Sequence, residues 1–205
     1  MNNNITQIFP TPIGKYKMNR FFSKEELNYI KNIESNTYKN HGNKTSIDTD
    51  ILDNIILSDI KKQCEDYLNL FFKNVYLPKE NSNLKIYITQ SWLNYTYKNE
   101  FHHMHSHPNS FLSGVLYIDA DKLHDMITFT KINHIYYDVD IKSANDYNTN
   151  EVFFKVNTGD IIIFPSHLHH RVPNTTNPNK RISLAFNSFF KGTIGNKMNL
   201  NYLEL

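Results

Sequence analysis

The spacing of apolar residues changes once along this chain, near residue 84, and this change limits the folds that the chain can adopt. In the segments 24–35 and 53–75, apolar side chains recur every three to four residues, as they do on one face of a helix. From Leu84 onward, apolar and polar residues alternate, which is the period of a β-strand. The sequence therefore predicts two helices followed by a β-rich remainder.

The two predicted helices are amphipathic. Ser23 and Glu26 have the spacing of a capping box, and Phe22 and Leu27 can form the hydrophobic staple that accompanies it, so the first helix is expected to start just after Ser23. The apolar face of the second helix is made of Ile56, Ile60, Cys64, Tyr67, Leu68 and Phe71. Each helix should pack that face on the rest of the protein. The polar segment 36–50 between them is predicted to be a loop.

The β part is predicted to contain about eight strands. Residues 84–97 read as one long strand or a bent pair of strands. The other strands are expected at 113–118, 127–130, 135–139, 151–156, 160–164 and 181–190. No helix is predicted between them, which excludes a doubly wound sheet and favours an antiparallel sandwich or a jelly roll backed by helices. Residues 1–205 are expected to form a single domain, with helices at about 24–75 and a β core at about 84–190.

The composition narrows the class of partners. Lys and Arg number 22 against 20 Asp and Glu, a net charge of +2, which predicts neither a basic stripe for nucleic acid nor a membrane-surface patch. The single cysteine excludes a disulfide scaffold and a cysteine-rich metal site. No apolar stretch is long enough to cross a membrane, and the amino terminus lacks the apolar run of a signal peptide. A cytoplasmic protein is therefore expected.

Seven of the ten histidines fall in two clusters, at 102, 103, 105 and 107, and at 167, 169 and 170. Side chains at i and i+2 of a strand point the same way, so His105 and His107 can face one metal ion together. His103 has the same parity, which makes 103 and 105 a rival pair. A facial metal site takes two nearby ligands and one from a distant strand. The second cluster can supply the third ligand, and local spacing alone does not choose among its three histidines.

Arg181 begins an apolar strand on which Arg181, Ser183 and Ala185 share a face. An arginine on an inward face needs a carboxylate partner, and none lies nearby in the sequence. A guanidinium with a neighbouring hydroxyl binds a carboxylate well, so this face is predicted to hold the carboxylate of a ligand. The alternative is a surface arginine at a strand end.

Tyr117 and Asn94 are further candidates for the same pocket. Tyr117 shares a strand face with Ser113 and Val115, and a buried tyrosine hydroxyl needs a hydrogen-bonding partner. Asn94 shares a face with Trp92 and with the apolar residues at the start of its strand. For both residues the competing interpretation is simple packing in the core.

With these residues in place, the chain resembles the iron(II)/2-oxoglutarate-dependent oxygenase superfamily, and in particular the small branch of 2OG-Fe(II) oxygenases found in bacteria and phages. The resemblance spans nearly the whole chain. It rests on Phe9-Pro-Thr-Pro, Trp92-Leu-Asn94, His105-Ser-His107-Pro-Asn-Ser-Phe-Leu-Ser-Gly-Val-Leu-Tyr117, Gly159-Asp-Ile-Ile-Ile-Phe-Pro-Ser166, Leu168-His-His170-Arg-Val172 and Arg181-Ile-Ser-Leu-Ala-Phe-Asn187.

The resemblance implies a mainly β fold, a double-stranded β-helix (a cupin-like jelly roll) with the two amphipathic helices packed on one side. It assigns His105, His107 and His170 to Fe(II), and this is what selects His170 from the second cluster. It assigns the distal carboxylate of 2-oxoglutarate to Arg181, Ser183 and Tyr117, and the pocket interpretation adds Asn94 to them. No catalytic residue is expected beyond the metal ligands.

The implied reaction is hydroxylation of a substrate by O2, with release of succinate and CO2. The wider superfamily usually has Asp or Glu where this chain has His107. A neutral ligand there leaves the iron site one charge more positive, which puts in question whether the reaction follows the usual hydroxylation course. Halogenase-like chemistry normally needs a small residue at that position, so His107 argues against it.

Two other functions fit the same pattern. One is a three-histidine metal dioxygenase on a cupin-like barrel that needs no 2-oxoglutarate, and the other is a non-enzymatic jelly roll that binds zinc. The substrate is not readable and is expected to be a small molecule or a protein side chain; a homo-oligomer is compatible with the sequence. The polar loop at about 132–150, with Tyr136, Tyr137 and Tyr147, is predicted to be a lid or substrate loop.

Overall fold

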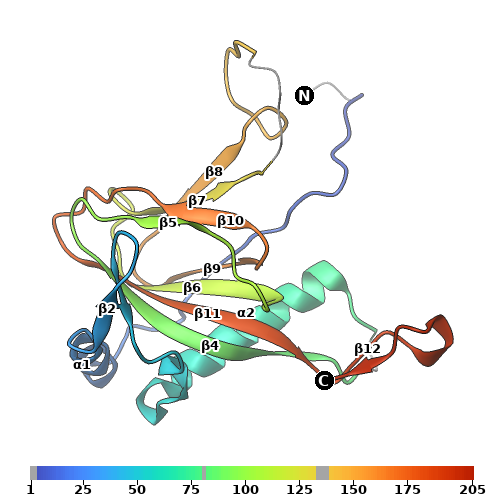
Figure 1. Ribbon diagram of the computed structural model, residues 1–205, viewed down its shortest axis with the longest axis horizontal. Helices are drawn as coiled ribbons and strands as arrows, with labels where there is room; N and C mark the ends of the chain where they lie inside the picture. Colours follow the sequence, from blue (N-terminus) through green and yellow to red (C-terminus); the bar gives the residue numbers. More distant parts are fainter. Residues whose placement is uncertain (1–3, 80–81, 133–138) are drawn as a thin grey trace.

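Two antiparallel sheets face each other, and two helices cover the outer side of the larger sheet (Figure 1). The computed structural model describes residues 4–79, 82–132 and 139–205. The larger sheet has the order β1-β9-β6-β11-β4-β3-β2. These strands span, in that order, Gly14–Lys17, Asp160–Pro165, Leu112–Asp119, Arg181–Lys191, Lys85–Thr96, Lys44–Ser46 and Thr37–Lys39.

The smaller sheet has the order β5-β10-β7-β8. Its strands span His102–His105, His169–Val172, Met126–Thr130 and Glu151–Lys155. A separate two-stranded sheet pairs β12 (Thr193–Ile194) with β13 (Leu203–Glu204) near the end of the chain. The predicted mainly β jelly roll with helices on one side is confirmed. The strands extend beyond the predicted range of about 84–190, because β1, β2 and β3 precede it and β12 and β13 follow it.

The first helix, α1 (Lys24–Ile33), begins as predicted. The Ser23 hydroxyl accepts a hydrogen bond from the Glu26 amide at 3.1 Å, and the Glu26 carboxylate accepts one from the Ser23 amide at 2.6 Å. The helix α2 (Ser58–Tyr76) begins later than predicted. Two 3₁₀ turns, η1 (Ile51–Asp53) and η2 (Ile55–Leu57), precede it, because Asn54 between them is extended and interrupts the helix.

The segment 36–50 is not the loop that the sequence predicts, because β2 and β3 form a hairpin within it. Its strands are short and polar, so they lack the apolar alternation that marks a strand. They form because β3 pairs with β4, with Thr45 opposite Asn94. The predicted strand at 135–139 lies outside the described residues except for Val139, and so do Tyr136 and Tyr137. Tyr147 of the same predicted loop is 53% exposed.

Strands of the larger sheet have two buried faces. Along β9, Ile161 and Ile163 belong to the apolar cluster beneath the helices, whereas Ile162 and Phe164 belong to the cluster between the sheets. Along β11, Leu184 and Phe186 face the helices and Ala185 faces the other sheet. Because successive side chains alternate, Arg181 and Ser183 must also lie on the face between the sheets.

Gly114 allows β6 and β11 to approach under the helices. It lies opposite Phe186, and a Cβ on Gly114 would lie 2.2 Å from Cζ of that ring. We expect Gly114→Ala to lower the free energy of unfolding by about 1–3 kcal/mol, because an overpacked core must shift buried side chains. Urea denaturation measures this loss. Phe186→Leu in the same background should recover part of it, and additive effects of the two substitutions would contradict the clash.

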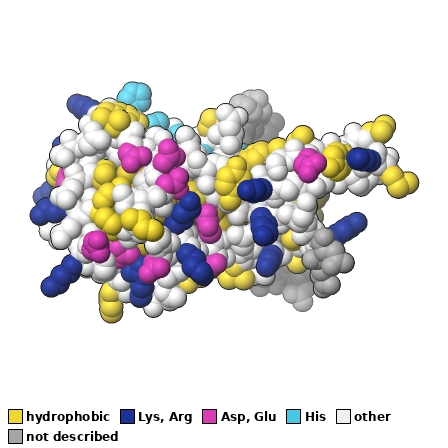
Figure 2. Space-filling view, turned by 90° about the horizontal axis from the view of Figure 1, so that it is seen from below, with side chains coloured by type: hydrophobic (Ala, Val, Ile, Leu, Met, Phe, Trp, Pro, Cys, Tyr) yellow, Lys and Arg dark blue, Asp and Glu magenta, His cyan; other side chains and the backbone are white. Residues whose placement is uncertain are grey.

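Figure 2 shows acidic and basic side chains interspersed on the face seen from below, with histidines at its upper edge. Within the described ranges, no helix is both long enough and apolar enough to cross a bilayer.

Candidate functional site

Three imidazoles from two separate stretches of the chain meet between the sheets. Strands β5 and β10 pair with His105 directly opposite His170, and the two ring centroids are 4.3 Å apart. His107 follows β5, where its amide donates to the Ser166 carbonyl at 2.9 Å. Its ring lies 5.1 Å from that of His105 and 5.0 Å from that of His170. One ring nitrogen from each residue lies within 4.8 Å of the others, a spacing that can hold a metal ion.

The hydrogen bonds of the three rings leave the same nitrogen free on each. Nδ1 of His105 lies 2.8 Å from the His103 carbonyl, and Nδ1 of His170 lies 3.0 Å from the Leu168 carbonyl. Nδ1 of His107 lies 2.6 Å from Oδ1 of Asn187. A carbonyl oxygen only accepts, so each Nδ1 donates its proton and each Nε2 keeps a lone pair. Metal-ligating histidines are usually held in this way.

Burial keeps these rings uncharged. Desolvation lowers the pKa of His107 to about 4 and that of His170 to about 3, and it lowers the pKa of His105 below its ordinary value. The positive charge of a neighbouring imidazolium would depress these pKa values further. All three residues are therefore neutral at pH 7, which is the form that binds metal ions.

Only one histidine of the second cluster joins this group. In the second cluster, His167 is exposed and His169 points to the opposite face of β10 from His170. Of these three residues, the structure brings only His170 to the His105–His107 pair. His103 shares the parity of His105, but it is not part of this triad.

Arg181 lies at the start of β11, 2% exposed, with its guanidinium carbon 5.1 Å from the ring centroid of Tyr117. Ser183 lies opposite Asn94 on β4 and opposite Tyr117 on β6. Directly opposed residues share a face, so these side chains line one interior surface. Among the described residues, no carboxylate forms an ion pair with Arg181.

Within the part of the chain that the structure describes, three buried polar atoms on this surface have no hydrogen-bonding partner: Nε of Arg181, the Tyr117 hydroxyl and Oγ1 of Thr96. Thr96 lies directly opposite Arg181. Burial raises the pKa of Tyr117 to about 12, against the effect of the nearby Arg181 cation, so the phenol keeps its proton at pH 7. Unpaired buried polar groups are costly. A bound carboxylate would accept hydrogen bonds from all three groups.

Two contributors to this surface were not singled out from the sequence. Thr96 continues the alternation of Trp92 and Asn94, so the parity of this half of β4 could have identified it. The prediction that Asn94 shares a face with the apolar residues at the start of its strand is wrong, because one extra residue in β4, Thr89, turns Ile86 and Ile88 toward the helices. Thr45 belongs to the unpredicted hairpin, and its hydroxyl donates to Oδ1 of Asn94 at 3.0 Å. It could not have been found without the pairing of β3 with β4.

A polar group behind His107 was likewise missed. The Ser113 hydroxyl lies 2.8 Å from Nδ1 of His107, donates to Oδ1 of Asn187 at 2.9 Å and contacts the Ser166 hydroxyl at 2.7 Å. These residues come from β6, β11 and the segment after β9. Together they hold the His107 ring with its Nε2 toward the other two imidazoles.

We expect Asn187→Leu to weaken divalent-metal binding by about 10- to 100-fold, the usual cost of removing the partner that orients a ligand. Leucine cannot accept the Nδ1 proton of His107, so the ring loses its fixed orientation. Titration of Ni²⁺ into the two proteins measures the difference. Asn187→Asp, which keeps an acceptor oxygen, is the matched control and should retain most of the affinity. Equal affinity in the leucine variant would show that Asn187 does not orient His107.

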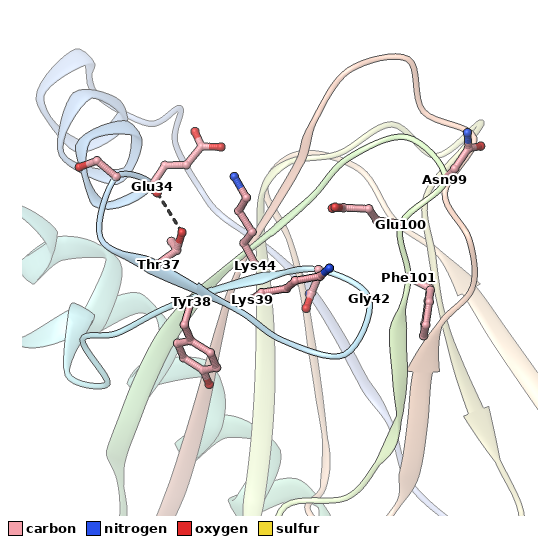
Figure 3. Close-up of a pocket in the computed structure, with 11 residues that line it drawn as sticks. Glu34, Thr37, Tyr38, Lys39, Gly42, Lys44, Asn99, Glu100 and Phe101 are labelled. Atoms are coloured by element: carbon pink, nitrogen blue, oxygen red, sulfur yellow. Dashed lines mark hydrogen bonds between the residues drawn. The ribbon is translucent and has the colours of Figure 1, made fainter.

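A surface cavity of about 760 Å³ lies beside the β2–β3 hairpin (Figure 3). Basic, acidic and aromatic side chains line it, including Lys39, Lys44, Glu100 and Phe101. It contains none of the residues predicted for the metal or for the carboxylate. Phe101 is adjacent in sequence to His102, so the cavity borders the histidine cluster at that point.

Comparison with known proteins gives a family match and several structures of similar fold. Residues 90–187 match the model of the family described as "Putative 2OG-Fe(II) oxygenase". The match covers β4 to β11 and therefore every residue predicted for the site. No curated protein gives a significant match.

Several crystal structures share the fold. An oxidoreductase of the 2OG-Fe(II) oxygenase family from Burkholderia pseudomallei is 15% identical, with a TM-score of 0.53 over 85% of this chain and 84% of that one. HygX from Streptomyces hygroscopicus, with nickel, 2-oxoglutarate and hygromycin B bound, is 12% identical, with a TM-score of 0.58 over 87% and 82%. A Pseudomonas putida prolyl-4-hydroxylase is 14% identical, with a TM-score of 0.51 over 86% and 92%.

Proposed function

We propose that the chain is a 2OG-Fe(II) oxygenase, as the family match of residues 90–187 supports, and that it uses Fe(II) and 2-oxoglutarate to hydroxylate its substrate with release of succinate and CO2. In this proposal His105, His107 and His170 hold the iron. Arg181, Ser183, Tyr117 and Asn94 hold 2-oxoglutarate.

The unpartnered polar atoms beside Arg181 are the observation that carries the proposal. Among the described residues, the Arg181 guanidinium has no carboxylate partner, and the buried Tyr117 and Thr96 hydroxyls have free hydrogen-bonding capacity. A metal-binding jelly roll without a cosubstrate has no need for such a set. A dicarboxylic acid satisfies these groups with one carboxylate and leaves the other end free to reach a metal. The same observation favours a 2-oxoglutarate enzyme over a three-histidine dioxygenase that needs no oxo acid.

The donor set also fits the metal. Three neutral imidazoles suit iron and the other divalent transition metals, and a facial arrangement leaves positions for a cosubstrate and O2. Fe(II) with 2-oxoglutarate and O2 supplies the oxidising power, with one oxygen atom entering succinate and the other entering the substrate hydroxyl.

The side chains of this protein supply positioning and the exclusion of water. Arg181 pairs with the distal carboxylate, and the Tyr117 phenol donates a hydrogen bond to it. Phe164 lies 4.7 Å from the His170 ring and Trp92 lies 5.5 Å from the His107 ring, so apolar rings surround the imidazoles. Arg181 itself is 2% exposed, and the low dielectric of such a buried position strengthens its pairing with an anion.

The substrate class stays open within this proposal. One fold neighbour is bound to hygromycin B and another is a prolyl-4-hydroxylase. The shared fold therefore fits a small molecule or a protein side chain.

Anaerobic addition of Fe(II) and then 2-oxoglutarate to the purified protein tests the proposal. We expect a weak visible charge-transfer band, followed by slow succinate formation when air is admitted. Glutarate has both carboxylates but no keto oxygen, so it is the matched control and should compete for binding without producing the band. Oxygen uptake without succinate would favour the cosubstrate-free dioxygenase. Neither band nor succinate would favour the non-enzymatic protein.

A further inference from the structure

Strand β5 contains an irregularity beside the metal triad. In its pairing with β10, His105 lies opposite His170 and His102 lies opposite Val172. Four positions on β5 (102 to 105) therefore match three on β10 (170 to 172), so β5 carries one extra residue, a β-bulge. Bulges redirect side chains. Here the bulge places the His102 ring against the His105 ring, with centroids 4.4 Å apart and an interplanar angle of 23°.

This bulge creates a second group of three histidines. One ring nitrogen each of His102, His103 and His105 lies within 4.8 Å of the others, and all three residues are partly exposed. The His103 ring centroid is 5.1 Å from that of His102 and 5.1 Å from that of His105. The proposed active site uses His105 from this group, but not His102 or His103.

The nitrogens of this second group are poorly satisfied by the protein. Among the described residues, Nδ1 of His103 is buried without a hydrogen-bonding partner. Nε2 of His102 accepts only a long hydrogen bond of 3.3 Å from Nδ2 of Asn40, which a metal ion can displace. Such nitrogens have lone pairs to offer to a cation, and a set of imidazoles suits Zn²⁺, Cu²⁺ and Ni²⁺.

We propose that His102, His103 and His105 form a second binding site for a divalent transition metal such as Zn²⁺, and that this site competes with the His105–His107–His170 site for the shared His105. Nδ1 of His105 is engaged by the His103 carbonyl, so the ring has one lone pair to give. An ion held by His102 and His103 uses the lone pair of His105, so only His107 and His170 remain as ligands for an ion in the first site. The protein therefore binds one ion in either of two positions.

A fourth imidazole lies within reach of this site. The His41 ring is 5.2 Å from the His103 ring. His41 is on the β2–β3 turn, which the Phe101 amide holds by donating to the Gly42 carbonyl at 3.0 Å. A Cβ at Gly42 would lie 2.6 Å from the Phe101 carbonyl, so the turn needs glycine there to approach β5 this closely.

Zinc binding to the metal-free protein tests the site without any turnover. Competition with a chromogenic chelator gives affinity and stoichiometry. We expect one equivalent for the wild type and one for His170→Ala, in which only the second site is complete. Adding His103→Ala to His170→Ala should weaken Zn²⁺ binding by more than about 100-fold, since even the partner of a ligand is worth about 10- to 100-fold. His105→Ala alone should remove tight binding, because it breaks both sites.

Two controls make the test specific. His167→Ala in the His170→Ala background should keep its equivalent of Zn²⁺, and a loss there would mean that His167 had replaced His170 in the first site. His107→Ala, with and without His103→Ala, repeats the comparison if His170→Ala fails to fold.

The inference is overturned if the single variants His170→Ala and His107→Ala bind no Zn²⁺, or if His103→Ala does not weaken them. Two equivalents in the wild type would refute the sharing of His105. The predicted consequence for catalysis, inhibition of succinate formation by excess Zn²⁺, rests on the proposed function. The binding experiment does not rest on the proposed function. A protein that binds Zn²⁺ as described but forms no succinate would therefore contradict only the oxygenase proposal.

Discussion

Replacing His170 with alanine will abolish the 2-oxoglutarate-dependent visible band and reduce succinate formation by more than about 100-fold, since even a residue that merely orients a ligand is worth about 10- to 100-fold. The Nε2 atoms of His105 and His107 then remain as a pair without the ligand that β10 supplies. Two imidazoles hold Fe(II) too weakly to keep it in place while the oxo acid binds. Absorbance under anaerobic conditions and succinate after admission of air are the two measurements.

The neighbouring His169 offers a matched control for that substitution. It lies one position earlier on β10 and points to the opposite face. His169→Ala should keep both the band and the succinate. If His170→Ala kept them while His169→Ala lost them, the third ligand would have to come from the other face of β10, and the described geometry would not be the catalytic one.

Replacing Arg181 with methionine will weaken 2-oxoglutarate binding by about 100- to 4000-fold. Removing one partner of a buried ion pair costs about 3–5 kcal/mol, and about 1.4 kcal/mol corresponds to a factor of ten. Metal binding should be unchanged, because Arg181 contacts none of the three imidazoles. The clearest readout is thermal: with Ni²⁺ already present, adding 2-oxoglutarate should raise the Tm of the wild type further and leave that of the variant unchanged.

The same substitution has an opposite effect on the protein without ligand. Arg181 is a buried cation with no carboxylate partner among the described residues. Methionine of similar length removes that uncompensated charge, so the free energy of unfolding of the ligand-free variant should equal or exceed that of the wild type. Arg181→Lys keeps the charge but loses the two-pronged geometry, and its affinity should lie between the two. A large loss of stability in the methionine variant would mean that Arg181 is structural rather than a ligand group.

The period of the sequence was sufficient to predict that Arg181, Ser183 and Tyr117 line one interior face. Alternation along β11 places Arg181 and Ser183 on one side, and alternation along β6 places Tyr117 on its matching side. These relations depend only on strands that remain regular over the residues concerned. The capping box of α1 was equally readable, because its two hydrogen bonds join residues three apart.

The features that the sequence did not predict lie where a strand departs from regular alternation. Parity predicts that His102 and His105 face opposite ways, and the bulge in β5 brings their rings together. The β2–β3 hairpin has no apolar alternation, so only its pairing with β4 reveals it. Extra residues and edge pairing are set by the neighbouring strand, and this information is spread over distant parts of the chain.

The two buried faces of the larger sheet limit how this protein can change in length. Deleting one residue between Ser183 and Phe186 would exchange the faces of the residues beyond it. A phenylalanine would then enter the space between the sheets while polar groups turned toward the helices. A single deletion would therefore disrupt the packing on both faces of the sheet. Insertions and deletions should therefore be tolerated in the exposed connection at 139–150, and hardly at all within β6, β9 or β11.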